Sequence, residues 1–144
     1  MRPVWIQKSV LLAVHAEQLA EHGGLPGIRD EARLDAALDR PKNLLAYGEP
    51  DIFDLAGAYA FGLAKGHAFV DGNKRTSFVA TELFLALNGY ELVADDAECV
   101  LKWLSLAEGS LSEAQLSDWL RQNRRLSQDQ EGTRPEDLNA SNDD

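Results

Sequence analysis

Apolar side chains recur every three or four residues through most of the chain, a spacing typical of amphipathic helices. The most regular stripe begins just after Asp51 and ends near Gly66. It consists of Ile52, Leu55, Ala56, Tyr59, Ala60 and Leu63. We therefore predict a helix over residues 51–66 with one continuous face in a hydrophobic core.

Two further helices are predicted before this one. Residues 8–22 carry an apolar stripe that stops at the Gly23-Gly24 pair. Asp30 can cap a second helix, which we expect to end at residue 40 because Pro41 disfavours the helical conformation of the residue before it. Residues 41–50 contain two prolines and a glycine, so we expect an ordered loop there that could act as a flap.

The remaining pattern predicts three more helices and almost no sheet. Residues 73–88 are apolar around much of the helical circumference, which predicts a central, buried helix. Asp95 can open the next helix, to Leu106, and Ser110 with Glu113 predicts a capping box for the last one. Residues 4–6 and 91–93 could each pair briefly as strands. The fold class we predict is all-α, a compact bundle of six helices.

Composition limits the chain to a single domain of modest size. A length of 144 residues with 44% apolar side chains fits one hydrophobic core. We assign residues 1–126 to this domain and expect residues 127–144, with six acidic and one basic side chain, to be a disordered acidic tail. The net charge of −10 disfavours nucleic acid as a partner, and the single cysteine, Cys99, argues against disulfide or thiolate-metal chemistry.

Nothing in the hydropathy pattern points to a membrane or to export. The longest apolar runs span only a few residues, far fewer than the ~20 needed to cross a bilayer. The first residues lack the apolar stretch of a secretory signal. We expect a soluble, cytoplasmic protein.

The densest polar cluster, residues 67–76, lies where the predicted central helix begins. Its sequence is His-Ala-Phe-Val-Asp-Gly-Asn-Lys-Arg-Thr. A helix start offers free N–H groups and partial positive charge, and Gly72 permits an anion to approach the backbone closely. Lys74 adds a point charge and Arg75 a planar fork, so the segment predicts a phosphate site.

Two side chains of the same segment suggest what happens to the phosphate. Asp71 supplies a carboxylate of the kind that binds Mg²⁺ together with phosphate oxygens. His67 can accept a proton at neutral pH and is the candidate general base. A base, a metal carboxylate and a cationic helix start together indicate transfer from a nucleotide to a hydroxyl group.

Each of these residue types also has a plainer interpretation. Outside this context His67 would more often be structural, and Asp71 could simply cap the helix. His15 and His22 lack other ligands at metal spacing and are expected to be structural or surface residues. We also assign Trp103 and Trp119, on the last two helices, to packing, although one edge could serve a protein partner.

The pattern His67-x-Phe69-x-Asp71-Gly72-Asn73-Lys74-Arg75-Thr76 resembles the signature of the Fic/Doc (Fido) superfamily, and its Doc branch most closely. The segments 24–30, 40–41, 47–49 and 88–92 also match family segments in family order, so the resemblance covers roughly residues 5–95. The resemblance implies a helical bundle of the Fido fold, in which the signature loop leads into the central helix.

The resemblance also implies roles for individual residues. His67 would be the catalytic base, Asp71 the Mg²⁺ ligand, and Asn73, Lys74 and Arg75, together with Gly72, the nucleotide-phosphate ligands. Phe69 would anchor the loop in the core.

Lys74 separates two possible reactions. Most Fic proteins carry glycine there and transfer AMP from ATP. Doc toxins share the lysine and are understood to bind ATP in the reversed sense, to transfer its γ-phosphate to a threonine of elongation factor Tu and so to arrest translation. The resemblance thus implies a Mg-ATP-dependent protein serine/threonine kinase that acts as a toxin and is restrained by a small, Phd-like antitoxin.

Three alternatives remain beside this interpretation. One is AMP transfer of the Fic kind, and another is a catalytically idle module that binds the antitoxin; the intact signature argues against the second. The third concerns regulation, because Ser127-x-x-x-Glu131-Gly132 matches the self-inhibitory string of other relatives. Against it, the position of the arginine that would pair with that glutamate is Phe78.

Overall fold

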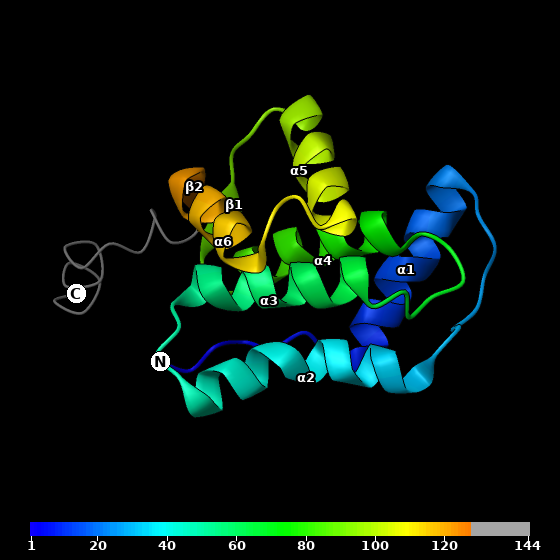
Figure 1. The fold of residues 1–144 in the computed structure, drawn as a ribbon, viewed down its shortest axis with the longest axis horizontal. Coiled ribbons are helices and arrows are strands. Elements are labelled where there is room, and N and C mark those ends of the chain that lie inside the picture. The colour runs from blue at the N-terminus through cyan, green and yellow to red at the C-terminus, as the bar shows by residue number, and fades with distance from the viewer. Residues whose placement is uncertain (128–144) are drawn as a thin grey trace, which may run out of the picture.

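The computed structural model describes residues 1–127, which form six helices and two short strands around one core (Figure 1). In chain order the elements are α1 (Lys8–His22), α2 (Glu31–Tyr47), α3 (Ile52–Lys65), α4 (Asn73–Leu87), β1 (Tyr90–Leu92), α5 (Asp96–Glu108), α6 (Glu113–Gln122) and β2 (Arg124–Leu126). The predicted all-α class and the number of helices are confirmed. Apart from Ser127, the predicted acidic tail and the self-inhibitory string lie outside the described residues.

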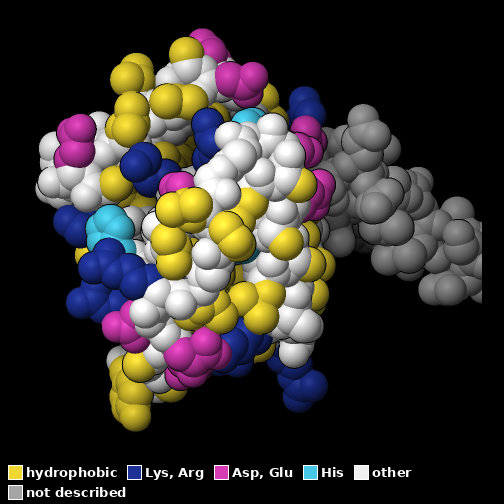
Figure 2. Space-filling view, turned by 90° about the vertical axis from the view of Figure 1, so that its right-hand side faces the viewer, with side chains coloured by type: hydrophobic (Ala, Val, Ile, Leu, Met, Phe, Trp, Pro, Cys, Tyr) yellow, Lys and Arg dark blue, Asp and Glu magenta, His cyan; other side chains and the backbone are white. Residues whose placement is uncertain are grey.

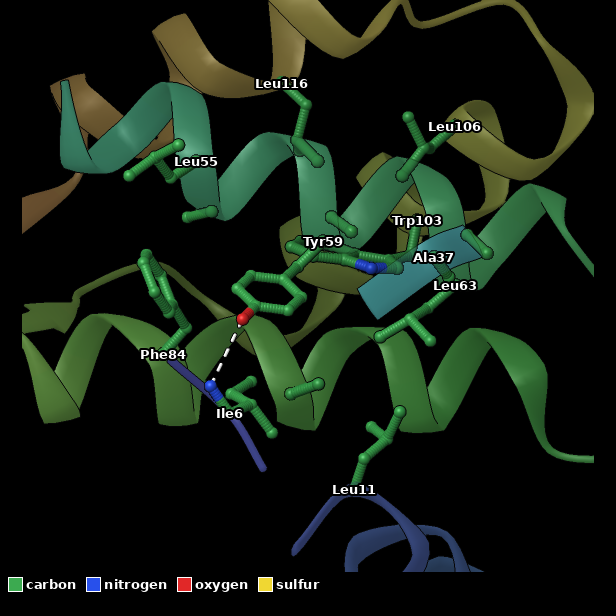
Figure 3. Packing of buried hydrophobic residues seen from close by; sticks show 14 of the residues in the cluster. Ile6, Leu11, Ala37, Leu55, Tyr59, Leu63, Phe84, Trp103, Leu106 and Leu116 are labelled. Atoms are coloured by element: carbon green, nitrogen blue, oxygen red, sulfur yellow. Dashed lines mark hydrogen bonds between the residues drawn. The ribbon is translucent and has the colours of Figure 1, made fainter. Parts of the chain in front are cut away.

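Helix α3 is the most enclosed element. A capping box joins Asp51 and Asp54 at its start, and nine of its fourteen residues are buried. Helix α2 lies along one side of α3, α5 and α6 lie along the opposite side, and α4 packs against it from behind (Figure 1). Figure 3 shows Tyr59 pointing from α3 toward the chain start, where its hydroxyl accepts a hydrogen bond of 3.1 Å from the Ile6 N–H.

Helix α4 begins at the predicted residue, Asn73, and its buried face includes Ser77 and Phe84. The Ser77 hydroxyl donates to the Ala60 carbonyl on α3 and accepts from the Trp103 indole on α5. These bonds fix α4 against two neighbouring helices, and with it the position of the loop that precedes it.

The predicted end of the second helix is wrong. Helix α2 continues through Pro41 to Tyr47, so most of the predicted loop is helical. Proline removes one helical hydrogen bond at a cost of about 3 kcal/mol. Here that cost is offset by packing, because Pro41 is buried and α2 lies close to α3. The Cα atom of Ala37 is only 3.2 Å from the position that a Cβ atom on Gly62 would occupy.

Two short strands, β1 and β2, pair in antiparallel orientation. Residues Tyr90–Leu92 pair with Arg124–Leu126, which places Tyr90 opposite Leu126, and the Ser127 N–H continues the ladder to the Gly89 carbonyl. The strand expected near residues 91–93 is thus confirmed. The one expected at residues 4–6 does not form, and the side-chain amide of Asn88 instead bonds the backbone of Val4 in both directions.

Helix ends account for the remaining differences. Asp95 caps α5 as predicted, and α5 runs two residues further than expected, to Glu108. The capping box of α6 joins Ser112 and Gln115 rather than Ser110 and Glu113, so the prediction was wrong by two residues. Among the described helices, none combines the length and the hydropathy that a membrane span requires.

Candidate active site

The loop between α3 and α4 carries the predicted site residues, and it starts with an unusual backbone conformation. His67 has φ +49°, the only positive φ of a non-glycine residue in the part of the chain that the structure describes. The left-handed region disfavours residues with a Cβ atom, and non-glycine residues held there cluster at functional sites. The exposed His67 side chain therefore depends on a loop that imposes this geometry.

Three backbone hydrogen bonds hold the loop against residues 27–30. The Ala68 carbonyl accepts from the N–H groups of Arg29 and Asp30, and the Val70 N–H donates to the Gly27 carbonyl. Asp30 also caps α2 by accepting from the Arg33 N–H. Asp30 thus caps α2 as predicted, and the segment 27–30, part of the family pattern, shapes the loop through its backbone.

Phe69 is buried beneath the loop, as the resemblance implies. The side chain of Asn73 closes the loop over it, since its Oδ1 accepts from the Phe69 N–H at 3.1 Å and its Nδ2 donates to the Phe69 carbonyl at 3.0 Å. Both polar groups of this amide are engaged with the loop backbone. A phosphate-binding role for Asn73 stays a prediction, and its backbone N–H is the group suited to it.

The Asp71 carboxylate is held in place by two backbone donors. Its Oδ2 accepts from the Leu25 N–H at 3.2 Å and its Oδ1 from the Gly72 N–H at 2.9 Å. A carboxylate offers about four lone-pair sites, so two remain for another ligand. The residue next in the chain, Gly72, is the N-cap of α4 with φ +76°, so Asp71 does not cap this helix.

Helix α4 starts without a side-chain cap among the described residues. The first N–H groups of a helix have no partner within it and carry partial positive charge. Lys74 and Arg75 follow directly and are both exposed. The helix start therefore presents backbone donors and two cations on one side.

All six predicted site residues line one open pocket of about 460 Å³. They are His67, Asp71, Gly72, Asn73, Lys74 and Arg75, and the apolar part of the wall consists of Ala64, Val70 and Ala107. Pockets of about 300–1,000 Å³ accommodate small ligands. Figure 2 shows one face of the molecule on which Lys and Arg side chains gather beside an exposed His side chain, although the whole protein is acidic.

Comparison with known proteins agrees with this geometry. A family model described as the Fic/DOC family matches residues 5–85, which include the whole loop. The chain is 36% identical over 117 residues to a protein of Escherichia phage P1 named "Protein kinase doc", covering 81% of this chain and 92% of that protein. It is also 46% identical over 76 residues to the "Toxin Doc" of Mycolicibacterium smegmatis, covering 51% of this chain and 58% of that protein.

This chain belongs to the Fic/DOC family. The resemblance inferred from the signature residues is thereby confirmed, and the helical bundle agrees with it. The roles of the individual residues within the family pocket stay predictions.

The sequence predicted His15 to be a structural or surface residue, and it is structural, but its contacts with the loop were not predicted. His15 on α1 is buried below the loop, and its ring contacts Phe69 while its Nε2 reaches the Asp71 carbonyl. The sequence contained a signal, because His15 lies four residues after the buried Leu11 on one helix face. His22, on the same helix, is half-exposed near Glu21, as expected of a surface residue.

Proposed function

We propose that this protein is a Doc-type toxin that transfers the γ-phosphate of Mg-ATP to a serine or threonine hydroxyl of a protein target. The observation that carries the proposal is the single pocket in which an exposed histidine, a carboxylate, two cations and an uncapped helix start meet. The relative named protein kinase, aligned over most of its length, supports the reaction class, and the relative named toxin supports the biological role.

The helix start and the two cations would bind the phosphates. Backbone N–H groups of α4 offer directed hydrogen bonds, Lys74 a mobile charge, and Arg75 a fork suited to two phosphate oxygens. Phosphoryl transfer depends mainly on positioning and on stabilising charge. An arrangement fixed by α4, which is itself anchored in the core through Ser77, meets both requirements.

Asp71 fits the role of a Mg²⁺ ligand. In the part of the chain that the structure describes, no three acidic, histidine or cysteine side chains gather as a complete metal site. Mg²⁺ in nucleotide enzymes usually needs only one or two carboxylates, because phosphates and water complete its coordination. When bound, Mg²⁺ would neutralise charge on the phosphates, and Asp71, held by two backbone N–H groups, would keep it beside the start of α4.

His67 would remove the proton from the attacking hydroxyl. In this step the hydroxyl oxygen forms a bond to the γ-phosphorus, the bond from that phosphorus to the β–γ bridging oxygen breaks, and ADP leaves. The proton passes to an imidazole nitrogen of His67. Because the His67 side chain lines the pocket and is exposed, a hydroxyl on a folded protein could reach it.

Lys74 favours phosphate over AMP as the transferred group. Its side chain lines the pocket beside Gly72, where the glycine of most Fic proteins would leave space for the α-phosphate. A nucleotide that avoids this side chain would present its γ-phosphate instead. AMP transfer of the Fic kind remains the competing reaction.

A second pocket, of about 590 Å³, adjoins the first and suits a partner protein. It lies between α1, α4 and α5, shares Lys74 and Arg75 with the site, and has Phe78 and Trp103 in its wall. We propose this groove for an apolar segment of a Phd-like antitoxin with acidic flanks, which would complement the two cations. An occupant there would lie next to the phosphate site and could block it.

The test is the intact mass of elongation factor Tu after incubation with Mg-ATP and either the wild-type protein or His67→Ala. We expect the mass of one phosphate to be added by the wild type and none by the variant. One added AMP would replace the kinase proposal with the Fic reaction. No addition by the wild type would refute this target and favour an idle antitoxin-binding module.

A further inference from the structure

A buried histidine on α1 supports the loop from below. Only 6% of His15 is exposed, and its ring stacks on that of Phe69 with centroids 3.7 Å apart and planes inclined by 8°. Its Nε2 lies 2.9 Å from the carbonyl oxygen of Asp71, which accepts the hydrogen bond. One side chain thus contacts the loop at two places, although it precedes the loop by more than fifty residues.

The bond from His15 fixes the peptide group between Asp71 and Gly72. The carbonyl of this peptide points to His15, and its N–H points to the Asp71 carboxylate, 2.9 Å away. Glycine occupies both halves of φ space readily, so this peptide could rotate at low cost if nothing held it. After rotation, the carbonyl oxygen would face the carboxylate and repel it.

The loop packs closely against side chains of α1 and against the backbone at Gly24. A Cβ atom on Gly72 would lie 3.3 Å from the Leu19 side chain and 3.7 Å from the His15 ring. A Cβ on Gly24 would lie 3.0 Å from the Asp71 carboxylate. Rotation of the peptide would break the hydrogen bond from His15 to the Asp71 carbonyl, so this bond opposes the rotation.

We infer that His15 is a positioning residue that holds the Asp71 carboxylate and the first N–H groups of α4 toward the phosphate pocket. It does not line that pocket and so acts through Asp71 and Phe69. Its effect on catalysis rests on the proposed phosphotransfer. Its effect on the loop is independent of the proposed phosphotransfer and can be measured without nucleotide.

Two substitutions separate the two contacts. His15→Phe keeps an aromatic ring on Phe69 but leaves the Asp71 carbonyl without its donor. His15→Gln places an amide donor near the Nε2 position but removes the ring. His22→Phe, on the exposed side of the same helix, is the matched control.

The first readout is amide hydrogen exchange of residues 68–73 without nucleotide. Losing one hydrogen bond should speed exchange of the Gly72 amide in His15→Phe by about three- to tenfold. Exchange in α3 should stay unchanged, and His15→Gln and His22→Phe should resemble the wild type. Unchanged exchange in His15→Phe, or equal acceleration in α3, would reduce His15 to a packing residue.

The second readout is phosphotransfer at saturating ATP over a range of Mg²⁺ concentrations. We expect His15→Phe to require about three- to tenfold more Mg²⁺ for half-maximal rate, with recovery in His15→Gln. The same Mg²⁺ requirement in all variants would overturn the link to Asp71. If the wild type transfers no phosphate, the proposed function fails, while the exchange comparison still decides whether His15 holds the loop.

Discussion

Replacing His67 by glycine should give a more stable protein than replacing it by alanine, although both changes remove the proposed base. His67 adopts φ +49°. A residue with a Cβ atom loses roughly 1–2 kcal/mol in this conformation, and glycine does not. Glycine in turn lowers the free energy of unfolding by about 0.5–1 kcal/mol relative to alanine, because the unfolded chain has more conformational freedom to lose at a glycine. The expected net advantage of His67→Gly over His67→Ala is therefore roughly 0.5–1 kcal/mol.

The comparison between these two variants isolates the backbone, because both lack the imidazole. For a chain of this size, such a difference corresponds to a midpoint about 1–4 °C higher for His67→Gly in thermal unfolding. Urea unfolding gives the free energy directly, and both variants should be inactive in phosphotransfer. If His67→Gly were no more stable than His67→Ala, the left-handed geometry would not be a property of the folded loop, and strain at the proposed base would be refuted.

Two other substitutions test the hydrogen bonds of the loop and the ionic contacts at the start of α3. Asn73→Asp keeps the acceptor for the Phe69 N–H but sets a carboxylate oxygen against the Phe69 carbonyl, so the free energy of unfolding in urea should fall by about 1–3 kcal/mol. The control Asn43→Asp, at an exposed position on α2, should lose almost no stability. Equal losses in the two variants would contradict the hydrogen bonds described for Asn73. Burial raises the pKa of Asp51, but hydrogen bonds from Arg121 and from the first turn of α3 outweigh this and leave its pKa below the ordinary value. Asp51 therefore stabilises the fold above pH ~4, and this effect is lost as pH falls through the lowered pKa. Asp51→Asn should be less stable than wild type at pH 7, and the difference in urea unfolding should shrink as the pH is lowered toward that pKa. A difference that stays constant with pH would exclude the ionic contribution.

That the candidate site residues share one pocket could be predicted because they are nearly consecutive. His67, Asp71, Lys74 and Arg75 fall within nine positions at the junction of a loop and a helix. Side chains so close in sequence at a helix start must share one region of space. Local sequence was therefore sufficient to predict that they meet.

The supports of the site could not be predicted in the same way, because they come from distant parts of the chain. The hydrogen bonds from Arg29 to Ala68 and from His15 to Asp71 join residues 39 and 56 positions apart. Pattern arguments describe which face of a helix is buried but not what it contacts. The direction of the Asn73 side chain, turned back to Phe69, likewise depends on the folded loop.

Tertiary packing also explains the errors in the fold. Pro41 ends a helix by local rules, but in this chain its ring is part of the buried face that α2 presents to α3. The strand at Tyr90–Leu92 has its partner more than thirty residues later, where the charged sequence Arg124-Arg125 gave no strand pattern. Both features arise from contacts between residues that are far apart in the sequence, which a pattern read over a short stretch of sequence does not contain.

The central claim, that Lys74 makes this pocket transfer phosphate rather than AMP, is tested most directly with two labelled nucleotides. Purified wild-type protein and Lys74→Gly would be incubated with elongation factor Tu, Mg²⁺ and ATP labelled at either the γ- or the α-phosphate. The account predicts that the wild type transfers only the γ label and that Lys74→Gly loses this transfer. Transfer of the α label by the wild type would contradict it.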